Sequence, residues 1–198
     1  MPFPATESVP VNDFNSLQHR IAKLEKELKL QNALSTQDRT EDAMSMVVFS
    51  GELDRLLASF VIATGAAACG TKVSMFFTFW ATAALKKEGK QAKGKSVMER
   101  MFGWMLPGGF NKQKLSKMDM CGLGRKMMLN EMQKKNVPSL EELIEIAGDL
   151  DVEINICEMS MSLMGIKEEE LIDYPHKQFC GVAHFVEQSS RAQSSLFI

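Results

Sequence analysis

The chain has 198 residues, of which 45% are hydrophobic and 24% charged, and its formal net charge is −2. This length suits one main domain with a short appendage, and the composition excludes a collagen, a wholly disordered chain and a protein that coats nucleic acid by charge. We therefore expect no nucleic-acid partner. The longest apolar runs, residues 56–69 and 73–85, are shorter than the roughly 18 residues of a membrane span. Lys72 lies between them, so we interpret both as buried core and expect no membrane span.

The four cysteines lie far apart and form no CxxC pair, and no secretory signal precedes them; they are Cys69, Cys121, Cys157 and Cys180. This spacing argues against a disulfide framework and against a zinc ribbon. Cys180 and His184 are four residues apart on an expected helix, but two ligands do not make a metal site. The sequence therefore predicts free thiols in a reducing, cytoplasmic setting and no bound metal.

The first 43 residues differ from the rest of the chain. Residues 1–15 contain three prolines and no apolar period, which predicts a flexible arm. Within residues 16–43, apolar side chains spaced 4, 3, 4 form the seam of two heptads, and a polar linker follows from residue 35 to 42; the seam consists of Leu17, Ile21, Leu24 and Leu28. Two heptads are marginal in isolation, so this amphipathic helix either forms a coiled coil with another subunit or lies on the main domain. Oligomerisation is slightly favoured.

From residue 44 onward, strand and helix patterns alternate. Ser139 and Glu142 form a capping-box pattern at the start of one helix. Strand, helix and strand in this order predict a right-handed crossover, parallel strands, and ligand sites beyond the carboxyl ends of the strands. The expected strands cover residues 44–49, 72–77, 152–157 and 195–198, and the expected helices cover about 52–68, 140–148 and 181–191.

Residues 86–135 form a methionine-rich, basic insert with 13 Lys or Arg and 4 acidic residues, a balance of +9. Residues 139–173 carry 11 acidic residues against the single Lys167, a balance of −10. We expect two insert helices, over 97–106 and 123–135, above the carboxyl edge of the sheet. Self-association, folding of one segment over the other, separate partners and plain solvation all remain open. The run Lys86, Lys87, Lys90, Lys93 and Lys95 either attracts an anionic cosubstrate or acidic carrier protein, or forms a solvated loop.

Three segments follow the expected strands: Ser50-Gly51, Thr78-Phe79-Trp80 and residues 157–160. Cys157 is the most informative position, because a thiol at a strand end facing backbone N–H groups is favoured as thiolate. A buried structural cysteine is the competing interpretation. A hydrolase would need His176 or His184 beside Cys157, and nothing in the sequence places either there. Dinucleotide and Walker-type motifs are absent from the sequence.

Residues 72–80 (KVSMFFTFW), the methionine-rich insert and residues 152–166 (VEINICEMSMSLMGI) resemble the larger single-chain branch of the DsrE/DsrF-like family. The most specific piece is Cys157-x-x-Ser160-Met161-x-Leu163-Met164-Gly165, and the resemblance covers about residues 44–198. It implies an α/β fold with an open, mostly parallel, flavodoxin-like sheet and helices on both faces. It also implies homo- or hetero-oligomers that carry sulfane sulfur as a cysteine persulfide and exchange it with TusA-like or rhodanese-like proteins.

The resemblance implies that Cys157 is the nucleophile and persulfide carrier of a sulfurtransferase-like protein that needs no metal or organic cofactor. The residues expected to shape its pocket are Gly51, Phe77, Thr78, Trp80, Ser160 and Met161. Ala81 stands where the family pattern suggests glycine, which would narrow the pocket. Cys69, Cys121 and Cys180 match no shared motif, and a resolving role for one of them stays open. The alternatives are an oligomeric scaffold without turnover, in which Cys157 is structural, and a nucleotide- or flavin-binding module suggested by fold analogy.

Overall fold

The computed structural model describes residues 20–29, 41–89, 91–106 and 108–198, and the chain divides into two units, residues 1–39 and 40–198. In the first unit, residues 20–29 form a helix whose side chains Ile21, Leu24 and Leu28 are each more than half exposed. The predicted amphipathic helix is therefore present over these residues. Leu17, the arm over 1–15 and most of the predicted linker lie outside the described residues.

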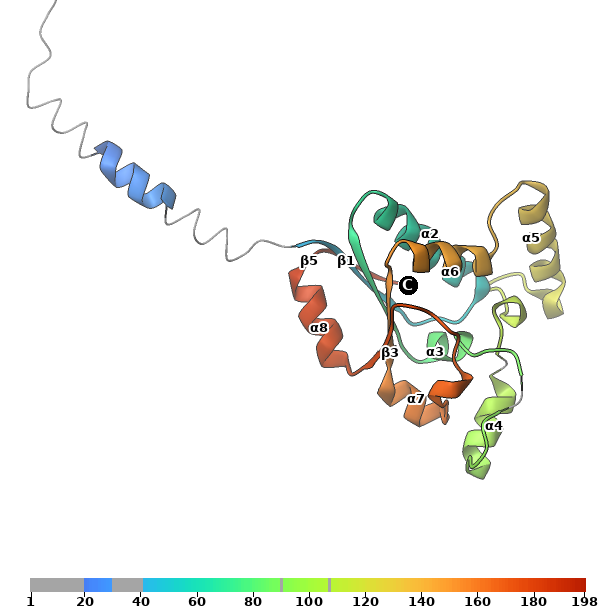
Figure 1. Ribbon diagram of the computed structural model, residues 1–198. Coiled ribbons are helices and arrows are strands. Elements are labelled where there is room, and N and C mark those ends of the chain that lie inside the picture. Colours follow the sequence, from blue (N-terminus) through green and yellow to red (C-terminus); the bar gives the residue numbers. More distant parts are fainter. Residues whose placement is uncertain (1–19, 30–40, 90, 107) are drawn as a thin grey trace, which may run out of the picture. The chain divides into compact units, whose positions relative to one another are not determined.

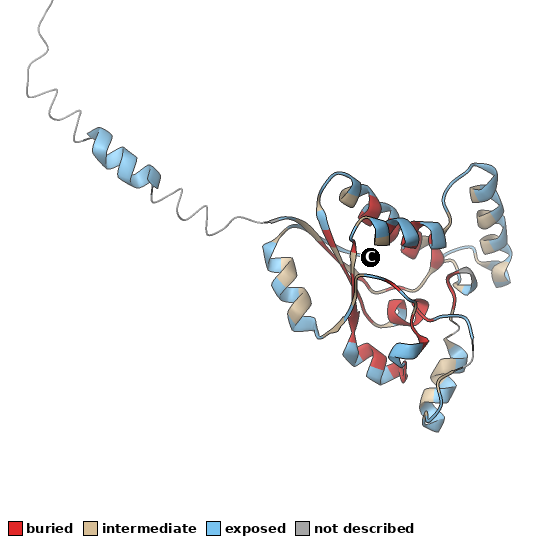
Figure 2. Cartoon of the chain, viewed as in Figure 1, coloured by how far each residue is buried: buried red, intermediate tan, exposed pale blue. Residues whose placement is uncertain are grey.

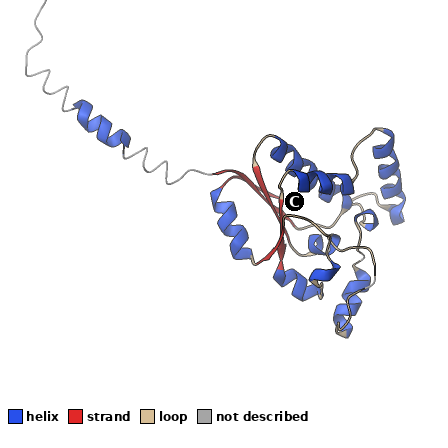
Figure 3. Cartoon of the chain, viewed as in Figure 1, coloured by secondary structure: helices blue, strands red, loops and turns tan. Residues whose placement is uncertain are grey.

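The second unit is built on a five-stranded sheet in the order β4-β3-β2-β1-β5 (Figure 1). All four strand pairings are parallel, as predicted. The strands are β1 (Glu41–Val48), β2 (Lys72–Phe77), β3 (Glu153–Cys157), β4 (Lys177–Cys180) and β5 (Ala192–Phe197). Figure 3 shows the strands between the helices, so the parallel sheet is covered on both faces.

Helices α2 (Leu53–Ala68) and α6 (Leu140–Asp149) pack against each other on one face of the sheet, and α8 (Val182–Arg191) covers the other face. The short helices α3 (Trp80–Ala84) and α7 (Glu158–Met164) begin at the carboxyl ends of β2 and β3. Buried residues gather in the sheet and along α2, α6, α3 and α7 (Figure 2). The Ser139 capping box that the sequence predicts is present at the start of α6.

The two faces of β3 have different neighbours. Side chains alternate along a strand, so Ile154 and Ile156, both fully buried, lie on one face and Cys157 lies on the other. In the neighbouring strand, Phe76 lies on the same face as Cys157 and stacks on Phe185 of α8, with ring centroids 5.3 Å apart. Cys157 therefore belongs to the α8 face of the sheet, at its carboxyl edge.

The insert contains α4 (Val97–Met105) and α5 (Leu123–Lys134), joined through short 3-10 turns at η1 (Phe110–Lys112) and η2 (Met120–Gly122). Neither helix has a buried residue, and α4 contacts α7. The large apolar side chains that these helices and the preceding turn expose are Val97, Met98, Met101, Trp104, Met105, Met118, Met120, Leu123 and Met127. The predicted pair of helices is present, and it presents apolar surface to solvent.

The structure differs from the sequence prediction in its shortest elements. Strand β1 begins at Glu41 rather than at 44, and β4, α3 and α7 were not predicted. The expected helix shared by Cys180 and His184 is wrong: Cys180 ends β4, Gly181 caps α8, and His184 lies on that helix. Strand β4 has the sequence Lys-Gln-Phe-Cys, in which apolar and polar residues do not alternate, so its pairing with β3 determines it instead.

Candidate functional site

The site lies where β3 ends and α7 begins. Cys157 is both the last residue of the strand and the N-cap of the helix, with φ −69° and ψ 110°. At the N-cap, a side chain faces the backbone N–H groups of the first helical turn. The residue is 2% exposed, so its thiol is held inside the protein surface.

Two hydroxyl groups accompany the thiol. Ser160 lies on α7 and is fully buried, and its Oγ lies 3.0 Å from Oγ1 of Thr78, which follows β2. The N–H of Phe79 donates a hydrogen bond of 2.9 Å to the same Ser160 Oγ. This bond occupies Ser160 as an acceptor and leaves its hydroxyl hydrogen for another partner. The structure thus brings together Cys157, Thr78 and Ser160, three residues that the sequence assigned to one site.

The environment of Cys157 favours its thiolate. Burial raises the pKa of the thiol, but hydrogen bonding from the side chain and backbone of Ser160, from the Thr78 hydroxyl and from the Met159 N–H lowers it by more. The net pKa lies below the ordinary value of 9.0. The backbone N–H groups of Met159 and Ser160 lower the pKa although neither forms a full capping hydrogen bond with the Cys157 side chain. The hydroxyl pair completes the stabilisation of the thiolate: one hydroxyl donates to the other, and the remaining hydroxyl hydrogen is directed to Cys157.

Phe79 holds a strained backbone conformation beside this network. Its φ of 46° and ψ of −123° lie in a region that favours glycine. Its ring packs on Phe49 at a centroid distance of 5.2 Å, and the Ala81 N–H donates to the Phe49 carbonyl at 3.2 Å. These contacts hold the turn that aims the Phe79 N–H at Ser160. Strain of about 1–3 kcal/mol at such a residue is typical of functional sites.

Gly51 and Trp80 meet through their backbones. A Cβ on Gly51 would lie 2.7 Å from the carbonyl oxygen of Trp80, so only glycine lets the loop after β1 approach the start of α3 this closely. The Trp80 side chain is 48% exposed and lies at the surface above this contact. Both residues therefore lie at the carboxyl edge of the sheet, where the sequence places them.

The two other predicted pocket residues are part of the core. Phe77 is fully buried and packs against Phe60 of α2 with ring centroids 6.0 Å apart. Met161 is 7% exposed and belongs to the same apolar cluster. Ala81 is fully buried in the first turn of α3. All three belong to the apolar core of the domain.

Cys180 lies next to Cys157. The two residues are paired in the register between β3 and β4. Burial raises the pKa of Cys180 to about 11, and the negative charges of Cys157 and Glu158 add to this effect. Sequence reasoning missed this neighbour because β4 itself was missed. Cys69 and Cys121 are exposed and lie at the end of α2 and in η2.

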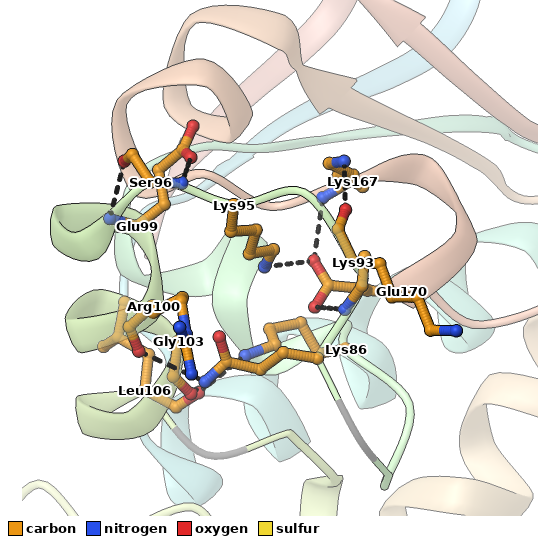
Figure 4. Close-up of polar contacts among 12 residues, drawn as sticks. Lys86, Lys93, Lys95, Ser96, Glu99, Arg100, Gly103, Leu106, Lys167 and Glu170 are labelled. Atoms are coloured by element: carbon orange, nitrogen blue, oxygen red, sulfur yellow. Dashed lines mark hydrogen bonds and ion pairs between the residues drawn. The ribbon is translucent and has the colours of Figure 1, made fainter.

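A buried ion pair connects the insert to the segment that follows α7 (Figure 4). Lys95 Nζ lies 2.6 Å from Glu170 Oε2, and the two side chains are 1% and 6% exposed. Glu170 also accepts hydrogen bonds from the N–H groups of Ala92 and Lys167. Lys86 Nζ donates to the carbonyl of Leu106 at 2.9 Å, just beyond α4. The loop before α4 is thereby tied to the segment after α7, and the end of α4 is tied to Lys86.

Helix α4 also reaches α7 directly. Gly165 ends α7 with a φ of +62°, and a Cβ there would lie 2.3 Å from Cγ of Glu99 on α4. Glu99 is the capping-box residue of α4 and accepts a hydrogen bond from the Ser96 N–H (Figure 4). The capping box of α4 and the glycine that ends α7 thus allow α4 to pack on the helix that carries Ser160.

The opposite charges of the two middle segments are partly paired within the chain. Lys95 pairs with Glu170, and Lys87 lies 2.8 Å from Asp173. Folding of one segment over the other, one of the open possibilities, therefore occurs. The interpretation of the basic run as a freely solvated or anion-attracting loop is wrong for Lys86 and Lys95, because both are buried and bonded.

Of the two histidines that a hydrolase could place beside Cys157, the structure puts His176 away from it. His176 immediately precedes β4, at the opposite end of that strand from Cys180, and its Nε2 lies 3.1 Å from Asp151 Oδ1. No group of three or more His, Cys, Asp or Glu in the described part of the chain is arranged to hold a metal ion. None of the described helices has the length and apolar character needed to cross a bilayer.

Comparison with known proteins adds an independent observation. The sequence profile of the DsrE/DsrF/DrsH-like family matches residues 40–197. The chain belongs to this family. Its match therefore includes β1 to β5, the insert and the Cys157 site.

Two curated proteins align with this chain along nearly their whole length. An uncharacterized Bacillus subtilis protein, YrkE, is 42% identical over 154 residues, which cover 78% of this chain and 95% of YrkE. The sulfur carrier protein DsrE2 of Allochromatium vinosum is 30% identical over 167 residues, covering 78% of this chain and 97% of DsrE2. The crystal structure of the YchN protein from E. coli aligns with a TM-score of 0.46 and 11% identity, covering 79% of this chain and 98% of YchN.

Proposed function

We propose that this DsrE/DsrF/DrsH-like protein is a sulfur carrier that holds sulfane sulfur as a persulfide on Cys157 and passes it to the thiol of a partner. The observation that carries the proposal is the thiolate-favouring environment of Cys157 at the β3–α7 junction. The relationship to DsrE2, which is described as a sulfur carrier protein, supports the same role. Such chemistry requires reduced thiols, in keeping with a cytoplasmic setting.

Loading requires one displacement at sulfur. The Cys157 thiolate attacks the terminal sulfur of a donor persulfide, a new S–S bond forms, and the donor thiolate leaves with the electron pair of the broken S–S bond. Transfer reverses the roles: an acceptor thiolate attacks the terminal sulfur on Cys157, and the Cys157 thiolate is the leaving group. Neither step consumes an oxidant, because the sulfane sulfur keeps its oxidation state.

The hydroxyl groups around Cys157 assist both displacements. They stabilise the thiolate before loading and again when it leaves during transfer, since a lower pKa makes a thiol a better leaving group. Ser160 is held for this task by the Phe79 N–H, and Thr78 lies on the neighbouring strand end. These two residues are positioned by separate elements, α7 and β2, that meet at the carboxyl edge of the sheet.

Apolar surface near the site supports docking of a protein partner. Trp80, Met159 and Leu163, from α3 and α7, are 48%, 63% and 59% exposed. Exposed apolar side chains rimmed by polar residues are typical of interaction sites. In this proposal the partner is a sulfur-relay protein with its own persulfide cysteine, of the TusA-like or rhodanese-like kind, and the carrier itself forms homo-oligomers.

The proposal is tested by intact-mass analysis after incubation with a low-molecular-weight persulfide donor. The wild-type protein is compared with Cys157→Ser and with Cys69→Ser, which removes an exposed thiol at the end of α2. We expect a reducible gain of one sulfur atom in the wild type and in Cys69→Ser, mapped to Cys157 by peptide digestion. The Cys157→Ser protein should fold and take up no sulfur.

Equal loading of Cys157→Ser and the wild type, or sulfur spread over all four cysteines, would contradict the proposal. In that case a folded protein that captures its partner equally well with serine at 157 would identify a binding protein without turnover. A bound nucleotide or flavin after gentle purification would point instead to a ligand-binding module.

A further inference from the structure

A second thiol accompanies Cys157 at the edge of the sheet. The register of β3 and β4 runs from the pair Ile154 and Lys177 to the pair Cys157 and Cys180, and the last pair ends both strands. Neighbouring strands lie roughly 4.7–4.9 Å apart, and paired residues direct their side chains to the same face. That spacing falls inside the Cα separation of roughly 4.4–6.8 Å that a disulfide requires.

The two thiols differ in charge at neutral pH. Hydrogen bonding lowers the pKa of Cys157, whereas burial raises the pKa of Cys180 to about 11. The charge of Cys157 contributes to that rise, in keeping with the pairing of the two residues in the strand register. Cys157 is therefore the nucleophile that attacks a sulfur donor, and Cys180 is a neighbouring thiol that stays protonated at neutral pH.

The remaining cysteines have no comparable position. Cys69 is the C-cap of α2, and Cys121 lies in η2 with a φ of 59°. Both are exposed, and neither lies in a strand of the sheet. Cys180 is therefore the one thiol that the strand register places beside Cys157.

We propose that Cys180 is a resolving thiol that limits the lifetime of the persulfide on Cys157 by forming a Cys157–Cys180 disulfide and releasing hydrogen sulfide. This inference rests on the proposed carrier function. It adds a second outcome for the loaded sulfur: transfer to a partner when one is bound, and discharge as sulfide when none is.

The discharge step balances within the protein. Cys180 loses its proton, and its Sγ attacks the Sγ of Cys157. The S–S bond of the persulfide breaks, and the terminal sulfur leaves with the electron pair as hydrosulfide, which takes up the proton. The sulfane sulfur is reduced to sulfide while the two cysteine sulfurs are oxidised to a disulfide, so no external oxidant is consumed. A dithiol reductant then restores both thiols.

The protonation state of Cys180 determines the rate of the discharge step. Only the thiolate attacks sulfur, and a pKa of about 11 leaves a small thiolate fraction at neutral pH. A loaded carrier therefore keeps its sulfur long enough to meet an acceptor. The thiolate fraction rises tenfold for each pH unit below that pKa, so discharge accelerates in the same proportion until other groups limit it.

The test follows the decay of the loaded protein after the donor is removed. Wild type, Cys180→Ser and the control Cys121→Ser are loaded with a low-molecular-weight persulfide and sampled over time at two pH values one unit apart. In the wild type and in Cys121→Ser we expect sulfide release, a chain two hydrogens lighter than the unloaded protein, and a peptide that links Cys157 to Cys180. Cys180→Ser should lose all three and keep its sulfur.

The outcomes separate this inference from the function on which it rests. If Cys157 takes up no sulfur in any of the three proteins, the carrier function itself is wrong. If Cys157 takes up sulfur but the wild type and Cys180→Ser decay at the same rate without a linked peptide, the carrier function stands and the resolving role of Cys180 is wrong. A circular dichroism melt of each variant shows that the comparison is made between folded proteins.

Discussion

Replacement of Ser160 by alanine tests the physical basis of the site. The change removes a hydroxyl that lowers the pKa of Cys157, while the backbone N–H groups and Thr78 remain. A hydrogen bond to a charged group contributes about 1.5–3 kcal/mol. Because hydrogen bonding from Ser160 lowers the pKa of Cys157, we expect that pKa to rise when the hydroxyl is removed.

The same substitution also affects stability. Ser160 Oγ accepts the N–H of Phe79 at 2.9 Å, and alanine leaves that buried donor without its partner. An unsatisfied buried donor costs about 1–3 kcal/mol. We therefore expect Ser160→Ala to unfold at lower denaturant concentration. Ser162→Ala is the matched control, since Ser162 lies on the same helix and is exposed.

The assay is the pH dependence of Cys157 alkylation, followed by peptide mass analysis so that the other thiols do not interfere. The midpoint should lie below 9.0 in the wild type and in Ser162→Ala, and should move upward in Ser160→Ala. Sulfur loading at neutral pH should fall in parallel with the thiolate fraction. An unchanged midpoint in a folded Ser160→Ala protein would refute the argument that Ser160 stabilises the thiolate.

Two further predictions concern the supports of the site. Glu170→Gln leaves Lys95 buried without its counter-ion, so we expect a loss of about 3–5 kcal/mol in a denaturant titration. Burial raises the pKa of Glu170, but hydrogen bonding lowers it by more, so the pKa lies below 4.5. The contribution of Glu170 to stability is therefore present above pH 4.5 and is lost as the pH falls through the native pKa. Acid unfolding of the wild type should show this loss, and acid unfolding of Glu170→Gln should not. Gly51→Ala places a Cβ 2.7 Å from the Trp80 carbonyl and should cost about 1–3 kcal/mol, whereas Gly65→Ala meets no atom within 4 Å and should stabilise α2 by about 0.5–1 kcal/mol. Equal effects of the two glycine substitutions would contradict the close-approach argument.

The long elements could be predicted because each displays its own period. Strand β2 runs over residues 72–77, as its apolar run indicates, and α6 begins at the capping box of Ser139 and Glu142. Parallel pairing followed from the alternation of strands and helices. The short elements could not be predicted in this way, because α3 has five residues and α7 seven, and tertiary contacts decide their structure.

Only part of the site could be predicted from the sequence. Cys157 and Thr78 each follow a strong strand pattern, so their meeting at one edge follows from the topology. Ser160 was assigned through family resemblance, and its bond to the Phe79 N–H depends on a backbone conformation that no propensity for phenylalanine suggests. Cys180 was out of reach, since its relation to Cys157 exists only through the register of a strand that shows no period of its own.

The burial of Cys157 limits the access of donors and acceptors to the sulfur in the proposed carrier. At 2% exposure, a persulfide on Cys157 would be shielded from water and from stray thiols, which suits storage. In the proposed carrier, transfer to a protein partner then requires the site to open. Phe79 lies in the turn after β2, next to Thr78, and is held in a strained conformation by contacts with Phe49 and Ser160. Because the strain is released when those contacts break, opening at Phe79 costs less than opening of an unstrained turn would, and a partner that engages the exposed Trp80 next to it acts on the same turn.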